Sequence, residues 1–276
     1  MKKRTFLYNL INIIVLLLAV GIFALSYVIS GMATSFTIST LVVITVTVVL
    51  VHFLKAFRLY LALYGSDISL STYAKTYCKV TPVSILLPFK LGELFRMYCY
   101  GYTTGNMLKG IVTVILDRFV DTVALVTMII VVWIANGGLM MPIVYILAVF
   151  IAVAALLFFA FPGLYTYWKK FLLRANATPR KLRALRYLES FNRVYQEILT
   201  VTKGRGIILY ILSLLAWSIE MGSVAIFGGD LSDYLTSALS DSQSYELKQF
   251  IFISVILLIV IYLFVKAIDT LKTERN

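Results

Sequence analysis

Three ionisable residues gather around a proline- and glycine-containing segment: Lys90, Glu93 and Arg96, in Pro88-Phe-Lys-Leu-Gly-Glu-Leu-Phe-Arg96. A helix that begins at Gly92 would present free backbone amides and the positive end of its dipole. Lys90 and Arg96 would add charged donors, and the combination could hold an anionic group such as a lipid phosphate. The alternative is a Glu93–Arg96 pair, three residues apart on one helical face, that anchors the helix while Lys90 extends to water.

A second group of charged residues stands inside an apolar run: Asp117, Arg118 and Asp121. Asp117 and Asp121 share one face of a helix, and Arg118 is three residues from Asp121, so the arginine can lie between the carboxylates. Two interpretations stay open. The three charges neutralise one another as a structural clamp, or they reach across to the first group and close a polar pocket.

Glu220 is a single carboxylate separated by 14 uncharged residues from Arg205. Its depth makes it a candidate for protonation or for pairing with Arg118, and a partly hydrated structural carboxylate is the alternative. His52, the only histidine, stands beside Lys55, which favours an interfacial role over catalysis. We find no catalytic set of residues, no metal-ligand spacing and no cofactor motif.

The composition places these charges in a membrane protein. The chain of 276 residues is 61% hydrophobic and 14% charged, whereas soluble domains have roughly 45–50% apolar and about 25% charged residues. Residues 5–54 and 122–168 contain no charged side chain, and each stretch is more than twice the roughly 20 residues that cross a bilayer. The net charge of +12 would suggest nucleic acid in a soluble protein, but here the basic residues lie in the connections, so we expect no nucleic acid.

The uncharged runs predict a single all-α membrane domain, 1–276, built as a polytopic bundle of about six transmembrane helices. Of the 25 basic residues, 23 fall in connections on one face, whereas the connection 228–247 carries four acidic residues and no basic one. By the positive-inside rule both termini are cytoplasmic. We expect a multi-pass protein of the plasma membrane, namely the bacterial cytoplasmic membrane. The predicted spans are about 7–29, 38–57, 110–135, 142–161, 207–227 and 250–265.

The connection between the second and third spans predicts a re-entrant segment. A surface helix is expected over 69–80, and the apolar stretch that follows is too short to cross. Because Pro82, Pro88 and Gly92 interrupt this stretch, we expect residues 82–92 to dip into the bilayer and return. Broken backbone at that depth is tolerated where protein or a water-filled cavity satisfies it, so the segment would line an interior site.

The connection before the fifth span predicts a basic amphipathic helix over 180–198. Apolar residues recur there at spacings of three to four, with Thr178 as N-cap and Pro179 at the first position. We expect this helix to lie along the inner membrane surface, where basic side chains gain from anionic lipid. A cytoplasmic helix that packs on the bundle ends is the alternative. The membrane-surface basic residues are Arg180, Lys181, Arg183, Arg186 and Arg193.

Two of these strings together resemble a known family. Gly92-Glu93-Leu-Phe-Arg96 followed by Asp117-Arg118-Phe-Val-Asp121 is similar to the paired signature of the lysylphosphatidylglycerol synthase transmembrane-region, or flippase-like domain, family. In that family a proline-glycine turn usually precedes the first motif and the second usually begins Glu-Arg, where this sequence has Pro88-Phe89 and Asp117. Family members commonly carry a second proline- and glycine-rich re-entrant motif, where this chain has residues 227–233 and an acidic connection.

The resemblance implies a flippase-like protein of the cell envelope with a central lipid-headgroup cavity. We expect the chain to translocate or bind an anionic or aminoacylated phospholipid, or a lipid-linked envelope precursor. The predicted cavity residues are Lys90, Gly92, Glu93, Arg96, Asp117, Arg118, Asp121 and Glu220.

The resemblance also implies what the chain does not do. In the synthases, lysyl transfer belongs to a separate soluble domain, and because this chain ends at Asn276 we expect a stand-alone membrane domain that is not an enzyme and needs no cofactor. Membrane lipids, anionic ones above all, are the expected partners. Two alternatives remain: a non-transporting scaffold that docks an envelope glycosyltransferase or lipid-modifying enzyme on the basic helix, and a small-solute transporter.

Overall fold

The computed structural model is all-α: the regular elements among the residues it describes are helices, and no strand occurs there. It describes residues 10–15, 17–19, 21, 25, 38–66, 68–87, 91–136, 142–174, 178–226, 229–231, 234–235 and 245–274. The main helices are α2 (Ile38–Ala62), α3 (Leu70–Leu86), α4 (Leu91–Thr103), α5 (Met107–Asn136), α6 (Pro142–Arg174), α7 (Pro179–Thr202), α8 (Gly206–Ile226) and α10 (Tyr245–Glu274).

Four predicted spans coincide with helices that are long and apolar enough to cross a membrane. They are Leu41–Ala62 in α2, Met107–Ala135 in α5, Pro142–Arg174 in α6 and Gly206–Ile226 in α8. The first predicted span falls mostly outside the described residues, and the last corresponds to the apolar stretch Phe250–Val265 of α10. The count of six spans and the cytoplasmic position of the termini remain predictions.

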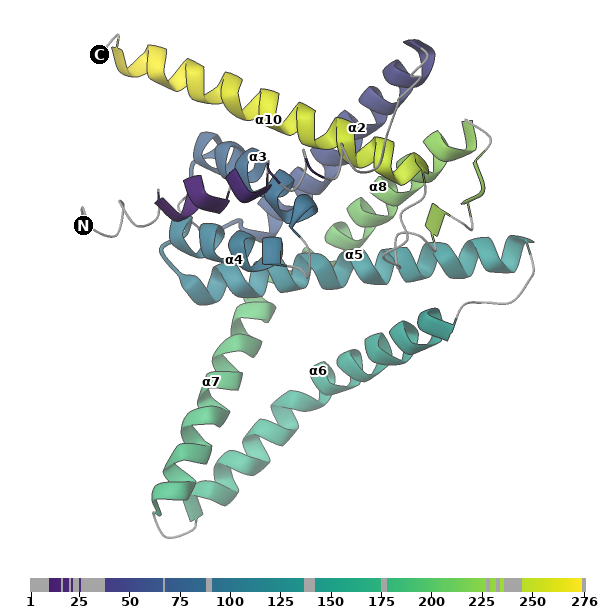
Figure 1. Cartoon of the computed structure of the whole chain (residues 1–276). Helices are drawn as coiled ribbons and strands as arrows, with labels where there is room; N and C mark the ends of the chain where they lie inside the picture. The colour runs from purple at the N-terminus through teal and green to yellow at the C-terminus, as the bar shows by residue number, and fades with distance from the viewer. Residues whose placement is uncertain are drawn as a thin grey trace.

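Helix α5 lies at the centre of the bundle. It contacts α2, α4, α6, α7 and α8, while α2 packs along α8 and α10 crosses α2 and α3 (Figure 1). Where α5 meets α8, Ala124 and Ile129 of α5 are buried in one apolar cluster with Trp217 and Val224 of α8. Burial of such side chains provides the packing that holds α5 and α8 together.

Helices α3 and α4 form a hairpin, and α3 is longer than the predicted surface helix 69–80. Pro82 lies inside α3, where it was expected to end the helix. Proline in a helix interior removes one backbone hydrogen bond, but Val80 and Val83 on either side are buried against Phe95 and Cys99 of α4. Tertiary packing therefore extends the helix through the proline. The segment 82–92 is thus helical as far as Leu86, and its depth in the bilayer remains a prediction.

Gly92 allows the two helices of this hairpin to approach each other closely. It is the second residue of α4, and its φ is not positive, unlike those of Gly65, Gly105 and Gly204. A Cβ at Gly92 would lie 2.4 Å from the Cα of Ser84 in α3, well inside van der Waals contact. Gly92 is therefore required because the two backbones touch, and not because the chain turns there.

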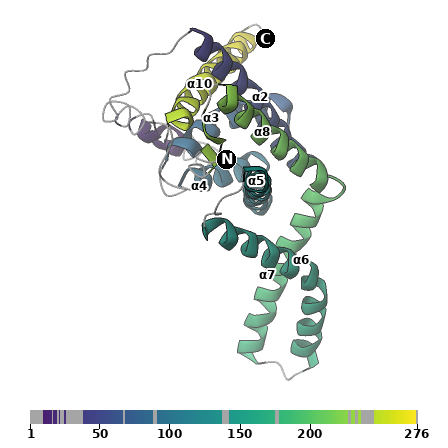
Figure 2. The same cartoon turned by 90° about the vertical axis from the view of Figure 1, so that its right-hand side faces the viewer.

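The basic helix is present as α7, but it pairs with α6 in a long hairpin. Thr178 caps α7 by accepting a hydrogen bond from the amide of Lys181 at 3.5 Å, and Pro179 begins the helix, as predicted. Helix α6 continues past the predicted span to Arg174, and the hairpin extends away from the other helices (Figures 1 and 2).

The side chains of α7 divide between the hairpin contact and solvent. The ring of Tyr195 packs 4.8 Å from that of Phe161 in α6, and Lys169 pairs with Glu189 at 2.8 Å. The predicted basic residues are exposed, except Lys181, which is half-buried. Their position along the inner membrane surface remains a prediction.

Candidate functional site: an ion-pair cluster between α2, α4, α5 and α8

Helix α2 brings two cations, Lys55 and Arg58, into the bundle. The predicted second span ended at residue 57, whereas α2 continues to Ala62. Arg58 therefore lies within the spanning helix, as Lys55 does, and the Arg58 side chain is only 3% exposed. Both residues belong to a group of paired charges that we call the ion-pair cluster: Lys55, Arg58, Glu93, Arg96, Asp117, Arg118, Asp121 and Glu220.

Arg58 occupies the position between the two aspartates of α5. Its Nη2 lies 2.8 Å from Oδ1 of Asp117, and its Nη1 lies 2.6 Å from Oδ1 of Asp121. The same guanidinium donates to the hydroxyl of Ser213 in α8. The sequence had offered Arg118 for this position. Arg58 takes it instead, and Arg118 pairs with Glu93 of α4.

Arg96 of α4 approaches Asp117 from the other side. Its Nη2 lies 3.2 Å from Oδ2 of Asp117, and its Nη1 lies 3.8 Å from Oε2 of Glu93. Asp117 is 2% exposed and accepts from two guanidiniums, so it is the most enclosed carboxylate of the cluster. The second group of charges therefore does reach across to the first group, through Asp117.

Glu93 and Arg118 form the open edge of the cluster. Nε of Arg118 lies 2.9 Å from Oε1 of Glu93, and the hydroxyl of Ser84 in α3 donates to the same oxygen at 2.7 Å. The Arg118 side chain is 45% exposed and that of Glu93 is 16% exposed, against 3% for Arg96. Arg118 is therefore the most exposed side chain of the cluster.

Glu220 completes the cluster on α8, where it pairs with Lys55 and not with Arg118. Nζ of Lys55 lies 2.7 Å from Oε1 of Glu220, and the hydroxyl of Tyr234 donates to the other oxygen at 3.2 Å. Lys55 also lies 5.4 Å from the ring centre of Trp217, within the range of a cation–π contact. The carboxylate at this depth is therefore paired and hydrogen-bonded.

The charges of the cluster balance. Among the described residues it holds four cations and four carboxylates, contributed by α2, α4, α5 and α8. They are Lys55, Arg58, Arg96, Arg118, Glu93, Asp117, Asp121 and Glu220. Ionisable groups in a membrane interior cost about 2.5–3.5 kcal/mol each and must find partners there. Pairing every charge removes most of this penalty and ties four helices together.

Seven of the eight predicted cavity residues lie in the described part of the structure. Glu93, Arg96, Asp117, Arg118, Asp121 and Glu220 are in the cluster, and Gly92 lies beside it at the α3–α4 contact. Lys90 lies outside the described residues. Helix α4 begins one residue before Gly92 and carries Glu93 in its first turn, so a carboxylate already stands at the positive end of its dipole. In the described part of the chain no group of His, Cys, Asp and Glu side chains is arranged to hold a metal ion.

Sequence reasoning missed Lys55, Arg58, Ser84, Ser213 and Tyr234. One signal was available for the first two: the apolar run resumes after Arg58 as Leu59-Tyr-Leu-Ala62, so the helix did not need to end at the first charge. No such signal marks Ser84, Ser213 and Tyr234. Their hydroxyls join the cluster only because the fold makes their helices neighbours of the charged residues.

The fold and this cluster define a multi-pass helical membrane protein with ionisable groups buried among its spans. The chain belongs to the lysylphosphatidylglycerol synthase TM region family, whose model matches residues 6–233. The family confirms the resemblance of the two charged motifs and points to a membrane protein of lipid or envelope processes. No curated protein and no solved structure matches the chain.

Proposed function

We propose that this protein binds the phosphate-bearing headgroup of a membrane lipid at the Glu93–Arg118 edge and carries that lipid between leaflets. The observation that supports this most is the contrast within the ion-pair cluster. Three of its carboxylates are enclosed and paired, whereas Arg118 is 45% exposed and, among the described residues, pairs with Glu93 alone, which also contacts Ser84 and Arg96. A guanidinium so placed matches a phosphate by its planar, forked donors.

The balanced charge of the cluster favours an exchange of partners. When the Glu93–Arg118 pair opens, the phosphate takes Arg118 while Glu93 keeps Ser84 and turns toward Arg96. An aminoacylated headgroup would bring an ammonium group as well, which pairs with Glu93 directly. A phosphate is common to anionic phospholipids, aminoacylated phospholipids and lipid-linked envelope precursors. In this proposal the phosphate is therefore the group that the site recognises.

Translocation then follows from alternate opening of the bundle around a fixed headgroup site near the membrane interior. In this proposal the re-entrant placement of the α3–α4 hairpin brings the headgroup to Glu93, which stands at the start of α4. The chain moves the lipid without modifying it, so no lysyl transfer is assigned to it.

The test is lipid translocation in reconstituted vesicles. Tail-labelled fluorescent phosphatidylglycerol and its lysyl derivative are followed by reduction of the dye in the outer leaflet. Arg118→Gln should slow translocation about ten- to a hundredfold, since a hydrogen bond to a charged group contributes about 1.5–3 kcal/mol. Lys169→Gln, which opens an ion pair outside the cluster, is the matched control and should leave the rate unchanged. Equal rates for Arg118→Gln and the control would reject the proposal.

A second candidate, scaffolding of an envelope enzyme, rests on the α6–α7 hairpin. Tyr187 and Phe191 of α7 are 67% and 64% exposed on an element that extends away from the bundle (Figure 2). A Tyr187→Ser, Phe191→Ser double variant would lose a stoichiometric partner in affinity purification while its lipid translocation stays intact. Retention of the partner by this variant would reject the scaffold function.

A further inference from the structure

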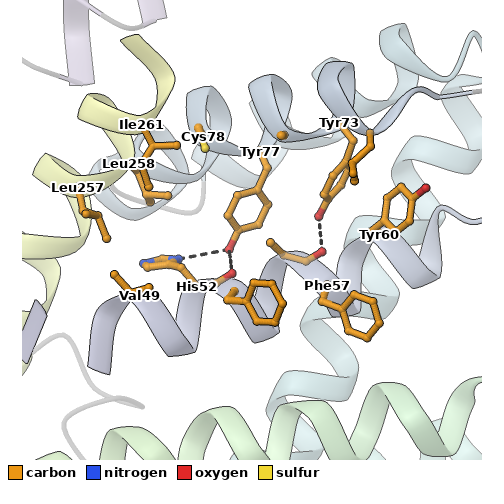
Figure 3. A pocket seen from close by; sticks show the side chains of 14 residues that line it. Val49, His52, Phe57, Tyr60, Tyr73, Tyr77, Cys78, Leu257, Leu258 and Ile261 are labelled. Atoms are coloured by element: carbon orange, nitrogen blue, oxygen red, sulfur yellow. Dashed lines mark hydrogen bonds between the residues drawn. The ribbon is translucent and has the colours of Figure 1, made fainter. Parts of the chain in front are cut away.

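A separate apolar groove runs between α2, α3 and α10, with a volume of about 430 Å³. This volume lies in the range of small-molecule sites, roughly 300–1,000 Å³. Helix α2 forms one wall, α3 the facing wall, and α10 closes one end (Figure 3). The residues that line it include Val49, Phe53, Ala56, Phe57, Tyr60 and Ala74.

The groove surface is apolar, because the polar groups of its walls are buried: two of them are hydrogen-bonded within the protein, and Nε2 of His52 is buried with no hydrogen-bond partner among the described residues. Nδ1 of His52 lies 3.2 Å from the hydroxyl of Tyr77, and the hydroxyl of Tyr73 donates to the backbone carbonyl of Ala56 (Figure 3). A charged headgroup would find no partner in such a groove and would lose its hydration. The surface therefore suits a hydrocarbon chain.

The groove and the ion-pair cluster lie on opposite faces of the same helix. At 3.6 residues per turn, Val49, Ala56 and Tyr60 fall on one face of α2, whereas Lys55 and Arg58 fall on the other. Helix α2 thus separates the charged interior from the groove, and a ligand in one site does not touch the other.

The length of the groove matches one leaflet. From Val49 to Tyr60 the helix rises about 16 Å at 1.5 Å per residue, and half of a hydrocarbon core of about 30 Å is roughly 15 Å. Tyr60 lies near the end of the span Leu41–Ala62, and Val49 lies near its middle. The rim residues Phe53 and Phe57 are 66% and 44% exposed, so the groove opens sideways into the hydrocarbon of that leaflet.

We propose that this groove holds one acyl chain of a membrane lipid from the leaflet at the Tyr60 end. The site requires only that α2 spans the bilayer, so it stands whether or not the protein translocates lipid. Bound lipid in the groove would fix α10 against α2 and α3.

A photoreactive lipid tests the proposal. The protein is reconstituted into phosphatidylcholine–phosphatidylglycerol vesicles that contain phosphatidylglycerol with a diazirine in its acyl chain, and is then extracted, washed in detergent and illuminated. Mass spectrometry should find the label at Phe53 and Phe57 several-fold above the label at Phe159, an apolar residue of α6 that is 79% exposed. If washing removes the photoreactive lipid from the groove as completely as from Phe159, neither site will be labelled on illumination. That result would overturn the proposal.

Groove-filling variants give an independent arm. Ala56→Trp and Ala74→Trp, from opposite walls, should each reduce the groove label several-fold at an unchanged melting temperature. Ala160→Trp, the same substitution on the exposed face of α6, is the matched control and should not reduce it. Arg118→Gln should keep the groove label even if translocation fails, which separates this proposal from the function above. Cross-links between two copies of the chain through the groove would show a protein occupant and overturn the proposal.

Discussion

Replacement of Arg58 by glutamine removes the central cation of the ion-pair cluster. Arg58 is the only described residue that bridges the two aspartates of α5, with contacts of 2.8 Å to Asp117 and 2.6 Å to Asp121. Asp117 keeps Arg96 at 3.2 Å, so the carboxylate left without a cation is that of Asp121, whose side chain is 13% exposed.

The expected loss follows from this geometry. Removing one partner of a buried ion pair costs about 3–5 kcal/mol, and because Asp117 retains a cation we expect the lower end, about 3 kcal/mol. At roughly 2–4 °C per kcal/mol for a chain of this size, the melting temperature in detergent should fall by about 6–12 °C. Asp121→Asn in the same chain should restore part of the loss, since it removes the uncompensated charge.

The assay is thermal unfolding of the purified protein, followed by intrinsic fluorescence, with single and double variants compared. Lys169→Gln provides the control, because both members of its pair with Glu189 are substantially exposed and such pairs contribute little. The reasoning is refuted if Arg58→Gln melts as the control does, or if adding Asp121→Asn lowers the melting temperature further.

Two other changes probe packing and charge. Gly92→Ala should lower the melting temperature, because its Cβ would meet the backbone of Ser84, whereas Gly222→Ala, with open space around it, should leave the temperature unchanged or raise it. A fall of equal size in both glycine variants would contradict this account. Hydrogen bonds from Lys169 hold the pKa of Glu189 below its usual range. The stability gained from that pair is therefore present above the ordinary glutamate pKa of about 4.3 and is lost as pH falls through the lower folded value. The difference in melting temperature between wild type and Glu189→Gln should therefore disappear at acid pH. A difference that grows at acid pH would contradict this prediction.

The sequence predicted the spanning helices well because their signal is local. Long uncharged runs are typical of helices that cross the bilayer, and α5, α6 and α8 begin within a few residues of their predicted positions. The N-cap at Thr178 could also be predicted from the sequence, because it depends on residues three positions apart. Cys78 and Cys99, which lie on α3 and α4, are buried and are not joined in a disulfide.

The partners of the charges could not be read in the same way. The aspartate spacing on α5 did predict a cation between Asp117 and Asp121, but Arg58 is 59 residues from Asp117 in sequence. Which helix supplies that cation depends on the packing of α2 against α8 and α5, a property of the tertiary fold. Pro82 shows the same limit: its intrinsic tendency ends a helix, and burial of Val80 and Val83 overrides it.

The most direct test of the central claim is lipid translocation by the Glu93→Gln, Arg118→Gln double variant. Removing both members of the pair together leaves no unpaired charge, so the melting temperature should stay close to that of wild type. If the open edge recognises the lipid phosphate, translocation of labelled phosphatidylglycerol falls to the rate of protein-free vesicles. If the double variant translocates at the wild-type rate, the pair is only a structural contact and the proposed headgroup site is wrong.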